Sequence, residues 1–179
     1  MKTFEFSIVA SGLDPAVEGF ADRFFDAGCD DATLSFQKGR IVLDFARAAD
    51  SLQSAIASAV DDVAKAGAKV DRIEPDPLVS LIEIAARSGL TRQAITNYAK
   101  GERAKSFPAP MARVTAESSL WDWATVARWM FKNHKIARDV AIEAEIVKAA
   151  NAAVTAGQTH LHEPLKKRAA EYEKELETA

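Results

Sequence analysis

Cysteine is nearly absent from this chain, which has a single one, Cys29, in 179 residues. One cysteine excludes an internal disulfide and a cluster of thiolate metal ligands, and we interpret Cys29 as a small residue near a helix end. The chain also lacks any apolar run near the ~18 residues of a membrane span. Its first residues alternate in polarity and do not form a signal-peptide core. We therefore expect a cytoplasmic protein without a membrane segment.

The patterns of catalytic and cofactor sites are missing too. The sequence has no glycine-rich phosphate loop and no nucleophile elbow. The adjacent carboxylates of Asp30-Asp31 and Asp61-Asp62 diverge in a loop or a helix, so we interpret both pairs as solvated ends. The His160-Leu-His162 run has no third ligand nearby and is interpreted as a surface loop. We therefore expect no enzyme activity, no cofactor and no metal site.

Charge is distributed unevenly along the chain, although the formal net charge is only −3. Residues 1–77 hold 8 Lys/Arg against 14 Asp/Glu, a net of −6. Residues 78–135 hold 9 against 4, a net of +5, and residues 136–179 hold 6 against 8, a net of −2. The middle segment therefore favours a polyanionic partner.

The first 75 residues show the pattern of four strands and two helices. Alternating polarity predicts strands over 3–9, 32–36, 40–46 and 68–74, with a hairpin turn at 37–39. Apolar residues at helical spacing predict a helix over 15–28, begun by Asp14-Pro15 and built on Val17, Phe20, Ala21, Phe24 and Phe25. A second helix, capped by Asp50 or Ser51, runs to Gly67. The order β-α-β-β-α-β resembles the ferredoxin-like fold, with an antiparallel sheet and both helices on one face. This α+β fold carries no function by itself.

The stretch 80–100 has the pattern of two short helices joined by a tight turn. Ser80 and Thr91 can cap the helices, because each hydroxyl can accept a hydrogen bond from a free amide of the first turn. Gly89 stands where the chain must leave the first helix. The residues predicted to pack the helices together are Ile84, Ala85, Leu90, Ile95 and Tyr98. The pattern predicts a helix-turn-helix, and an ordinary pair of packed helices is the alternative.

A loop, a small hairpin and a third helix are predicted to follow, which is the layout of a winged helix-turn-helix. The wing strands are expected over 111–115 and 120–123, and Asp122 or Thr125 caps the helix. The stretch 78–131 resembles the MerR/AlpA-like group of winged helix-turn-helix DNA-binding domains through three motifs. They are Glu83-Ile-Ala with Gly89-Leu-Thr91, the Phe107-Pro-Ala-Pro110 loop, and an end formed by Trp121, Trp123, Val126, Trp129 and Met130. Thr125 stands at a position where this group of domains usually has an acidic residue. We interpret the tryptophans as core.

The exposed face of the second helix would then read DNA. We expect major-groove contacts from Thr91, Arg92, Gln93, Thr96 and Asn97. Phosphate contacts are expected from Lys100, Arg103, Lys105 and Arg113. The predicted function is sequence-specific binding of double-stranded DNA in transcription regulation. The alternative is an antitoxin or adaptor whose acidic N-terminal domain binds a protein partner. The sequence also leaves open the binding of a small ligand by that domain.

The last 44 residues, 136–179, are predicted to be helical. An alanine-rich helix over 136–156 has a narrow apolar seam that can pack within the chain or against a second copy. Pairing would set two recognition helices on a palindrome, so we expect a homodimer. Residues 164–179 form a weak helical stripe of Leu165, Ala169, Tyr172 and Leu176, interpreted as a frayed tail. The expected division is therefore 1–75, 78–131 and 136–179.

Overall fold

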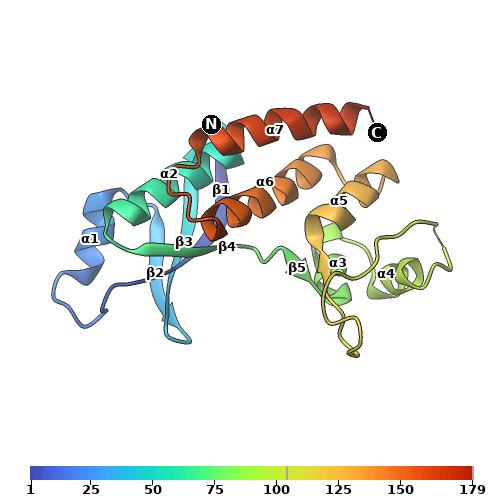
Figure 1. The fold of residues 1–179 in the computed structure, drawn as a ribbon, viewed down its shortest axis with the longest axis horizontal. Coiled ribbons are helices and arrows are strands. Elements are labelled where there is room, and N and C mark those ends of the chain that lie inside the picture. Colours follow the sequence, from blue (N-terminus) through green and yellow to red (C-terminus); the bar gives the residue numbers. More distant parts are fainter. Residues whose placement is uncertain (104, 179) are drawn as a thin grey trace. The chain divides into compact units, whose positions relative to one another are not determined.

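The computed structural model describes residues 1–103 and 105–178 and shows an α+β protein (Figure 1). The described residues form seven helices, a four-stranded sheet and a two-stranded one. The chain divides into two compact units. The first contains residues 1–75 and 146–172, and the second contains 76–145 and the residues from 173 onward. No described helix has the length and apolar character that crossing a bilayer requires.

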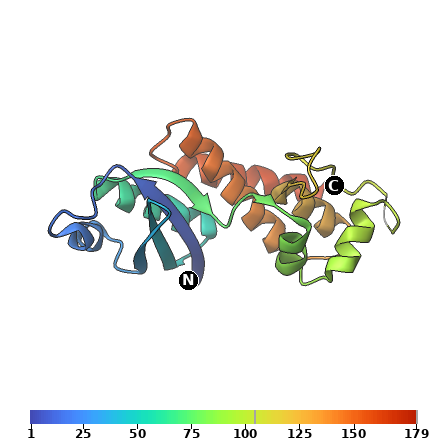
Figure 2. The ribbon, with the colours of Figure 1, turned by 90° about the horizontal axis from the view of Figure 1, so that it is seen from below.

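An antiparallel sheet organises the first unit. Its strands are β1 (Lys2–Ser11), β2 (Ala32–Gln37), β3 (Arg40–Ala49) and β4 (Lys69–Glu74), in the spatial order β2-β3-β1-β4. Helices α1 (Phe20–Ala27) and α2 (Leu52–Lys65) connect them. Figure 2 shows β1 and β4 side by side, as their antiparallel register requires. The predicted strands are confirmed.

The core of the first unit follows from the period-two alternation of the strands. Phe6 lies opposite Phe45, and their rings stack 5.3 Å apart. The residues of β1 and β3 that face this core are buried: Phe4, Phe6, Ile8, Ala10, Ile41, Leu43 and Phe45. Ile56 and Val60, four residues apart on one face of α2, are buried as well.

The β2–β3 hairpin turns through two residues, within the predicted turn at 37–39. Gln37 pairs with Arg40, so Lys38 and Gly39 alone make the turn. Both have positive φ, 49° and 78°. Such a turn matches the twist of the two strands, and glycine adopts this conformation without steric cost.

The predicted start of the first helix is wrong. Asp14 accepts a hydrogen bond from the amide of Ala16 through Oδ1, which makes a turn and not a helix cap. Gly19 has a φ of 74°, and α1 begins only at Phe20. Val17 therefore lies outside the helix and is 48% exposed. Phe25 lies within α1 but does not join the core either, with 65% of its surface exposed.

Arg47 is a buried cation that joins three elements of the first unit. Its guanidinium donates to both carboxylate oxygens of Asp31, at 2.8 and 2.9 Å, and to Asp62 at 2.8 Å. It also donates to Ser58 Oγ and to the carbonyl of Gly28. The interpretation of both carboxylate pairs as solvated ends is therefore wrong for one member of each pair, because an arginine lies between them.

Helical residues from the end of the chain complete the first unit. They belong to α6 (Arg138–Thr155) and α7 (His162–Glu177). Asn151 binds the backbone of Ile73 in β4 on both sides, accepting from its N–H at 3.0 Å and donating to its C=O at 2.8 Å. The Asn151 side chain thus makes the two hydrogen bonds with Ile73 that a neighbouring strand would make. The exposed loop residue His160, and His162 at the start of α7, both lie beside Asp61.

The predicted stripe of α7 is confirmed, but its interpretation as a frayed tail is wrong. Leu165, Ala169 and Tyr172 are buried in the first unit and Leu176 in the second. Within the second unit, Glu175 also forms an ion pair with Arg128 at 3.2 Å. A helix with four buried side chains has the packing that an isolated polar helix lacks.

Candidate nucleic-acid interface

Two short, well-capped helices form the centre of the second unit. Helix α3 (Leu81–Ser88) starts with a capping box, in which Ser80 Oγ accepts from the amide of Glu83 and the Glu83 carboxylate accepts from the amide of Ser80. Gly89 ends α3 in the left-handed conformation, with a φ of 69°. Thr91 caps α4 (Arg92–Ala99) by accepting from the amide of Ala94. The predicted caps and turn are confirmed.

The two helices are held together by a small apolar core. Ile84 and Ile95 are fully buried and Ala85 nearly so, whereas Leu90 and Tyr98 are half-buried. The third helix, α5 (Trp123–Lys132), is capped by Asp122, which accepts from the amide of Thr125. All three tryptophans are buried, as predicted.

An aromatic cluster ties the loop after α4 to this core. The ring of Phe107 lies 6.2 Å from that of Tyr98 and 5.0 Å from that of Trp129. Trp121 Nε1 donates to the carbonyl of Pro108 at 3.0 Å. The loop after α4 is therefore held against this core by contacts of Phe107 and Pro108, as its Phe and Pro residues predict.

The exposed face of α4 is polar and basic. Thr91, Arg92, Gln93 and Lys100 are all exposed. Thr96 is half-buried, and its hydroxyl donates to the carbonyl of Arg92. Polar side chains that remain free of the core are the type that reads base edges and phosphates.

Asn97 does not lie on that face, so its predicted exposure is wrong. Only 9% of its surface is exposed, and its Oδ1 accepts a hydrogen bond from Gln93 Nε2 at 2.8 Å. A helical period of 3.6 residues places position 97 one turn beyond Gln93, turned toward the inner side of α4. Asn97 therefore positions the amide of Gln93.

The predicted wing is much smaller than the sequence indicates. Only one bridge, between Ala112 and Leu120, joins its two arms, so the predicted strand over 111–115 is wrong. The return strand β6 (Trp121–Asp122) pairs with β5 (Leu78–Val79). Arg113 stands just after the bridge with a φ of 53°, and its carbonyl accepts from the amide of Ala116 and from Ser119 Oγ.

The exposed cations near α4 differ from four arginines elsewhere in the described residues. Arg40, Arg47, Arg128 and Arg138 all form ion pairs with carboxylates. By contrast, no ion pair within the described ranges involves five exposed cations of the second unit, namely Arg92, Lys100, Arg103, Lys105 and Arg113. Unpaired positive side chains leave a local field that attracts a polyanion.

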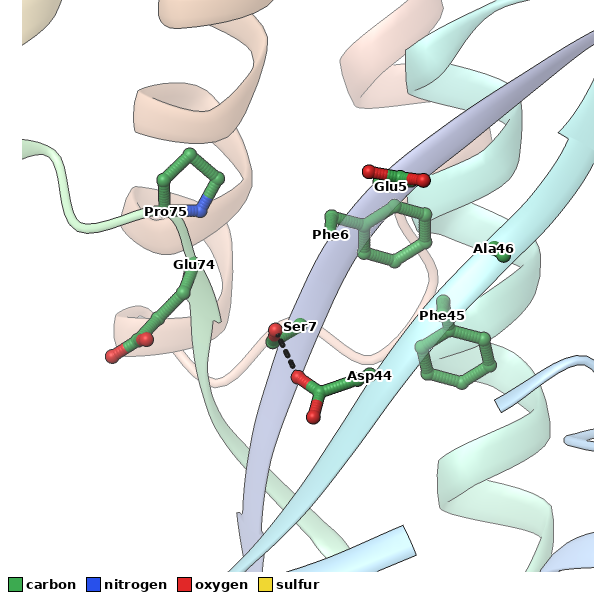
Figure 3. A pocket seen from close by; sticks show the side chains of 8 residues that line it. All are labelled: Glu5, Phe6, Ser7, Asp44, Phe45, Ala46, Glu74 and Pro75. Atoms are coloured by element: carbon green, nitrogen blue, oxygen red, sulfur yellow. Dashed lines mark hydrogen bonds between the residues drawn. The ribbon is translucent and has the colours of Figure 1, made fainter. Parts of the chain in front are cut away.

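A second candidate surface lies on the open face of the four-stranded sheet. A depression of about 650 Å³ is lined by Glu5, Ser7, Asp44 and Glu74 among others (Figure 3). Ser7 Oγ donates to Asp44 Oδ1 at 2.5 Å, from one strand to the next. Three carboxylates on adjacent strands make this face suited to a positively charged partner. Among the described residues, no three His, Cys, Asp or Glu side chains are placed to hold a metal ion.

Comparisons with known proteins add no assignment to these surfaces. No family model, no curated protein and no solved structure matches this chain.

Proposed function

We propose that this protein binds double-stranded DNA in a sequence-specific manner and acts in transcription regulation. The observation that carries the proposal is the exposed, unpaired basic surface formed by α4 and the loop after it. It stands on a pair of short capped helices whose inner side is buried. A helix of this kind fits the major groove of B-DNA, which admits an α-helix and presents a distinct pattern for each base pair.

In this proposal the first turns of α4 carry the sequence reading. Arg92 and Gln93 are exposed at the N-terminal end of the helix, the end that contacts base edges in helix-turn-helix proteins. The Asn97 bond occupies one N–H of Gln93 and leaves its other N–H and its Oε1 available. That pair matches the N7 acceptor and N6 donor of adenine.

The remaining cations would bind backbone phosphates and so fix the position of the protein along the DNA. Lys100 follows α4, Arg103 and Lys105 lie in the loop beyond it, and Arg113 lies beside the wing bridge. Phosphate contacts supply affinity without sequence information, and they make it depend on salt. The acidic segment 1–77, with a net charge of −6, would weaken non-specific binding.

The finer fold assignments are part of the same proposal. The β-α-β-β-α-β order and the sheet order β2-β3-β1-β4 support a ferredoxin-like arrangement for residues 1–75. For residues 78–131, the capped helix pair, the β5–β6 pairing and the single wing bridge support a winged helix-turn-helix of the MerR/AlpA-like type with a short wing.

Selection of bound sequences from a random DNA library, followed by anisotropy titrations, tests the proposal. We expect Arg92→Ala and Gln93→Ala each to cost about 1–3 kcal/mol on the selected site and to relax the preference at one base pair. Lys100→Ala should weaken binding to all sequences alike and reduce the salt slope by about 1. Arg23→Ala is the matched control, because Arg23 is an exposed helical arginine in the first unit. If Arg92→Ala and Gln93→Ala leave affinity and site preference unchanged, α4 is not the recognition helix.

The alternative function is an adaptor or antitoxin that holds a protein partner on its first unit. The acidic open face of the sheet, with Glu5, Asp44 and Glu74, favours it. The test uses the full chain, because residues 146–172 pack in the same unit as residues 1–75. Pull-down of a co-encoded basic partner by the wild type, but not by a Glu5→Lys/Asp44→Lys variant, would support the adaptor. Retention by both proteins would reject this face as the docking site.

A further inference from the structure

We propose that two copies of this chain associate through the outer edge of β2, in an antiparallel strand pair centred on Leu34. The proposal is independent of DNA binding, since it rests on the first unit alone. It also differs from the pairing through the seam of α6 that the sequence suggests.

The two edges of the four-stranded sheet are built very differently. Edge strand β4 reads KVDRIE, is charged at four of its six residues and is followed by Pro75. A register shift lies between β1 and β4 at Val9, and Asn151 occupies both backbone groups of Ile73. Charges, proline, bulges and covering side chains are the devices by which proteins block edge pairing.

Edge strand β2 has none of these devices. It reads ATLSFQ, has no charge and no proline, and pairs with β3 in an unbroken register. Asp31 O accepts from the amide of Ala46 in β3. Because antiparallel strands alternate their bonding direction, the N–H and C=O of Leu34 and Phe36 then point away from β3. An unprotected strand of this kind is a template for another strand.

Large apolar side chains are exposed beside the same edge. Phe36, on β2 itself, is 48% exposed and contacts the ring of Phe20 at 5.3 Å. Phe25 of α1 is 65% exposed and lines a cleft of about 250 Å³ between α1 and β2, together with Leu34. Figure 1 shows α1 next to β2. Exposed apolar groups gathered in one place mark an interaction surface.

The charges at the two ends of β2 identify a second copy as the partner. Asp30 precedes the strand and Lys38 follows it, and both side chains are exposed. In an antiparallel pair about a two-fold axis through Leu34, the end of β2 next to Asp30 in one copy meets the end next to Lys38 in the other. The same register sets Ala32 opposite Phe36 on the apolar face and Thr33 opposite Ser35 on the open face. A strand paired with itself is thus complementary in both charge and polarity.

The test measures the mass of the full chain by sedimentation equilibrium over a wide concentration range. We expect the wild type to reach the mass of two chains. The double variant Thr33→Lys/Ser35→Lys places like charges opposite each other twice, so its dimer Kd should rise roughly two- to thirtyfold. Thr3→Lys/Ala46→Lys is the matched control, because it adds the same charge at exposed positions of β1 and β3 on the same sheet face, outside the proposed strand pair. Its Kd should equal that of the wild type.

A charge-swapped variant guards against a trivial loss of folding. In Thr33→Lys/Ser35→Glu, opposite charges face each other across the axis, and the dimer should form at least as tightly as in the wild type. Amide exchange at Leu34 and Phe36 should slow as concentration rises. The proposal is overturned if the wild type stays monomeric or if the double-lysine variant dimerises as tightly as the wild type. It is also overturned if the charge-swapped variant is as weak as the double-lysine variant, or if concentration-dependent protection appears only in α6.

Discussion

Replacement of Arg47 by methionine should destabilise the first unit while leaving the second unchanged. The substitution keeps the long apolar stem and removes a guanidinium that is 91% buried and donates five hydrogen bonds. Burial by itself lowers the pKa of the Arg47 guanidinium, but the hydrogen bonds to Asp31 and Asp62 outweigh burial and raise that pKa. The guanidinium therefore keeps its positive charge in the folded chain, and its removal leaves two carboxylates without this partner.

The expected loss follows from the burial of those carboxylates. Breaking a buried ion pair by removing one partner costs about 3–5 kcal/mol. The side chains of Asp31 and Asp62 are 31% and 27% exposed, so water can replace part of the lost solvation. We therefore expect the lower end, about 3 kcal/mol. Arg40→Ala is the control, because Arg40 is 57% exposed in its pair with Asp71. Exposed pairs contribute about 0–1 kcal/mol.

The two units can be followed separately. Trp121, Trp123 and Trp129 all belong to the second unit, so their fluorescence follows the unfolding of that unit. Amide hydrogen exchange in β1 and β3 follows the first. Arg47→Met should speed exchange in those strands by a factor equivalent to about 3 kcal/mol, which is roughly 150-fold. A loss below about 1 kcal/mol, or an equal loss in Arg40→Ala, would refute the reasoning.

The remaining predictions concern Cys29, Asn97 and Gly89. Burial, followed by the negative charge of Asp62, raises the pKa of the Cys29 thiol to about 12, so iodoacetamide at about pH 8 should label it only after unfolding. Because the folded chain holds this proton more tightly, the contribution of Cys29 to stability should decline as pH rises from about 9 toward 12. Asn97→Ala should release the amide of Gln93 and relax its base preference in repeated DNA selection, with a stability change of about 1 kcal/mol or less in urea titrations. Gly89→Ala should cost about 1–2 kcal/mol by tryptophan fluorescence, because an alanine there must adopt a φ of 69°, whereas Gly39→Ala in the first unit should leave that signal unchanged.

Local signals in the sequence predict most of the elements of both units. The strands follow from alternation, the α3 and α4 boundaries from Ser80, Gly89 and Thr91, and the loop anchor from Phe107. These features depend on residues close together in the chain. The α+β class and the stripe of α7 follow in the same way, since each reflects one period of apolar residues.

Features that depend on distant residues could not be predicted. Two adjacent carboxylate pairs give no sign that an arginine from β3 will lie between them, because Arg47 is 16 residues from Asp31 and 15 from Asp62. Asn97 has the polarity of a surface residue, and only the rotation of α4 against its core buries it. A signal was available for the late start of α1, because Gly19 interrupts the run begun by Asp14-Pro15.

The division of the C-terminal helices between the units has a consequence for synthesis on the ribosome. Residues 1–75 emerge before the side chains that complete their unit, from Ile146 to Tyr172, which are made 71 to 97 residues after Pro75. At about 5–20 residues per second this interval lasts roughly 5–20 s. During that time the apolar surface that Leu165 and Tyr172 will cover has no native partner, and the open backbone of Ile73 awaits Asn151. A nascent chain stalled before residue 146 should therefore recruit holdase chaperones, and one released after residue 172 should not.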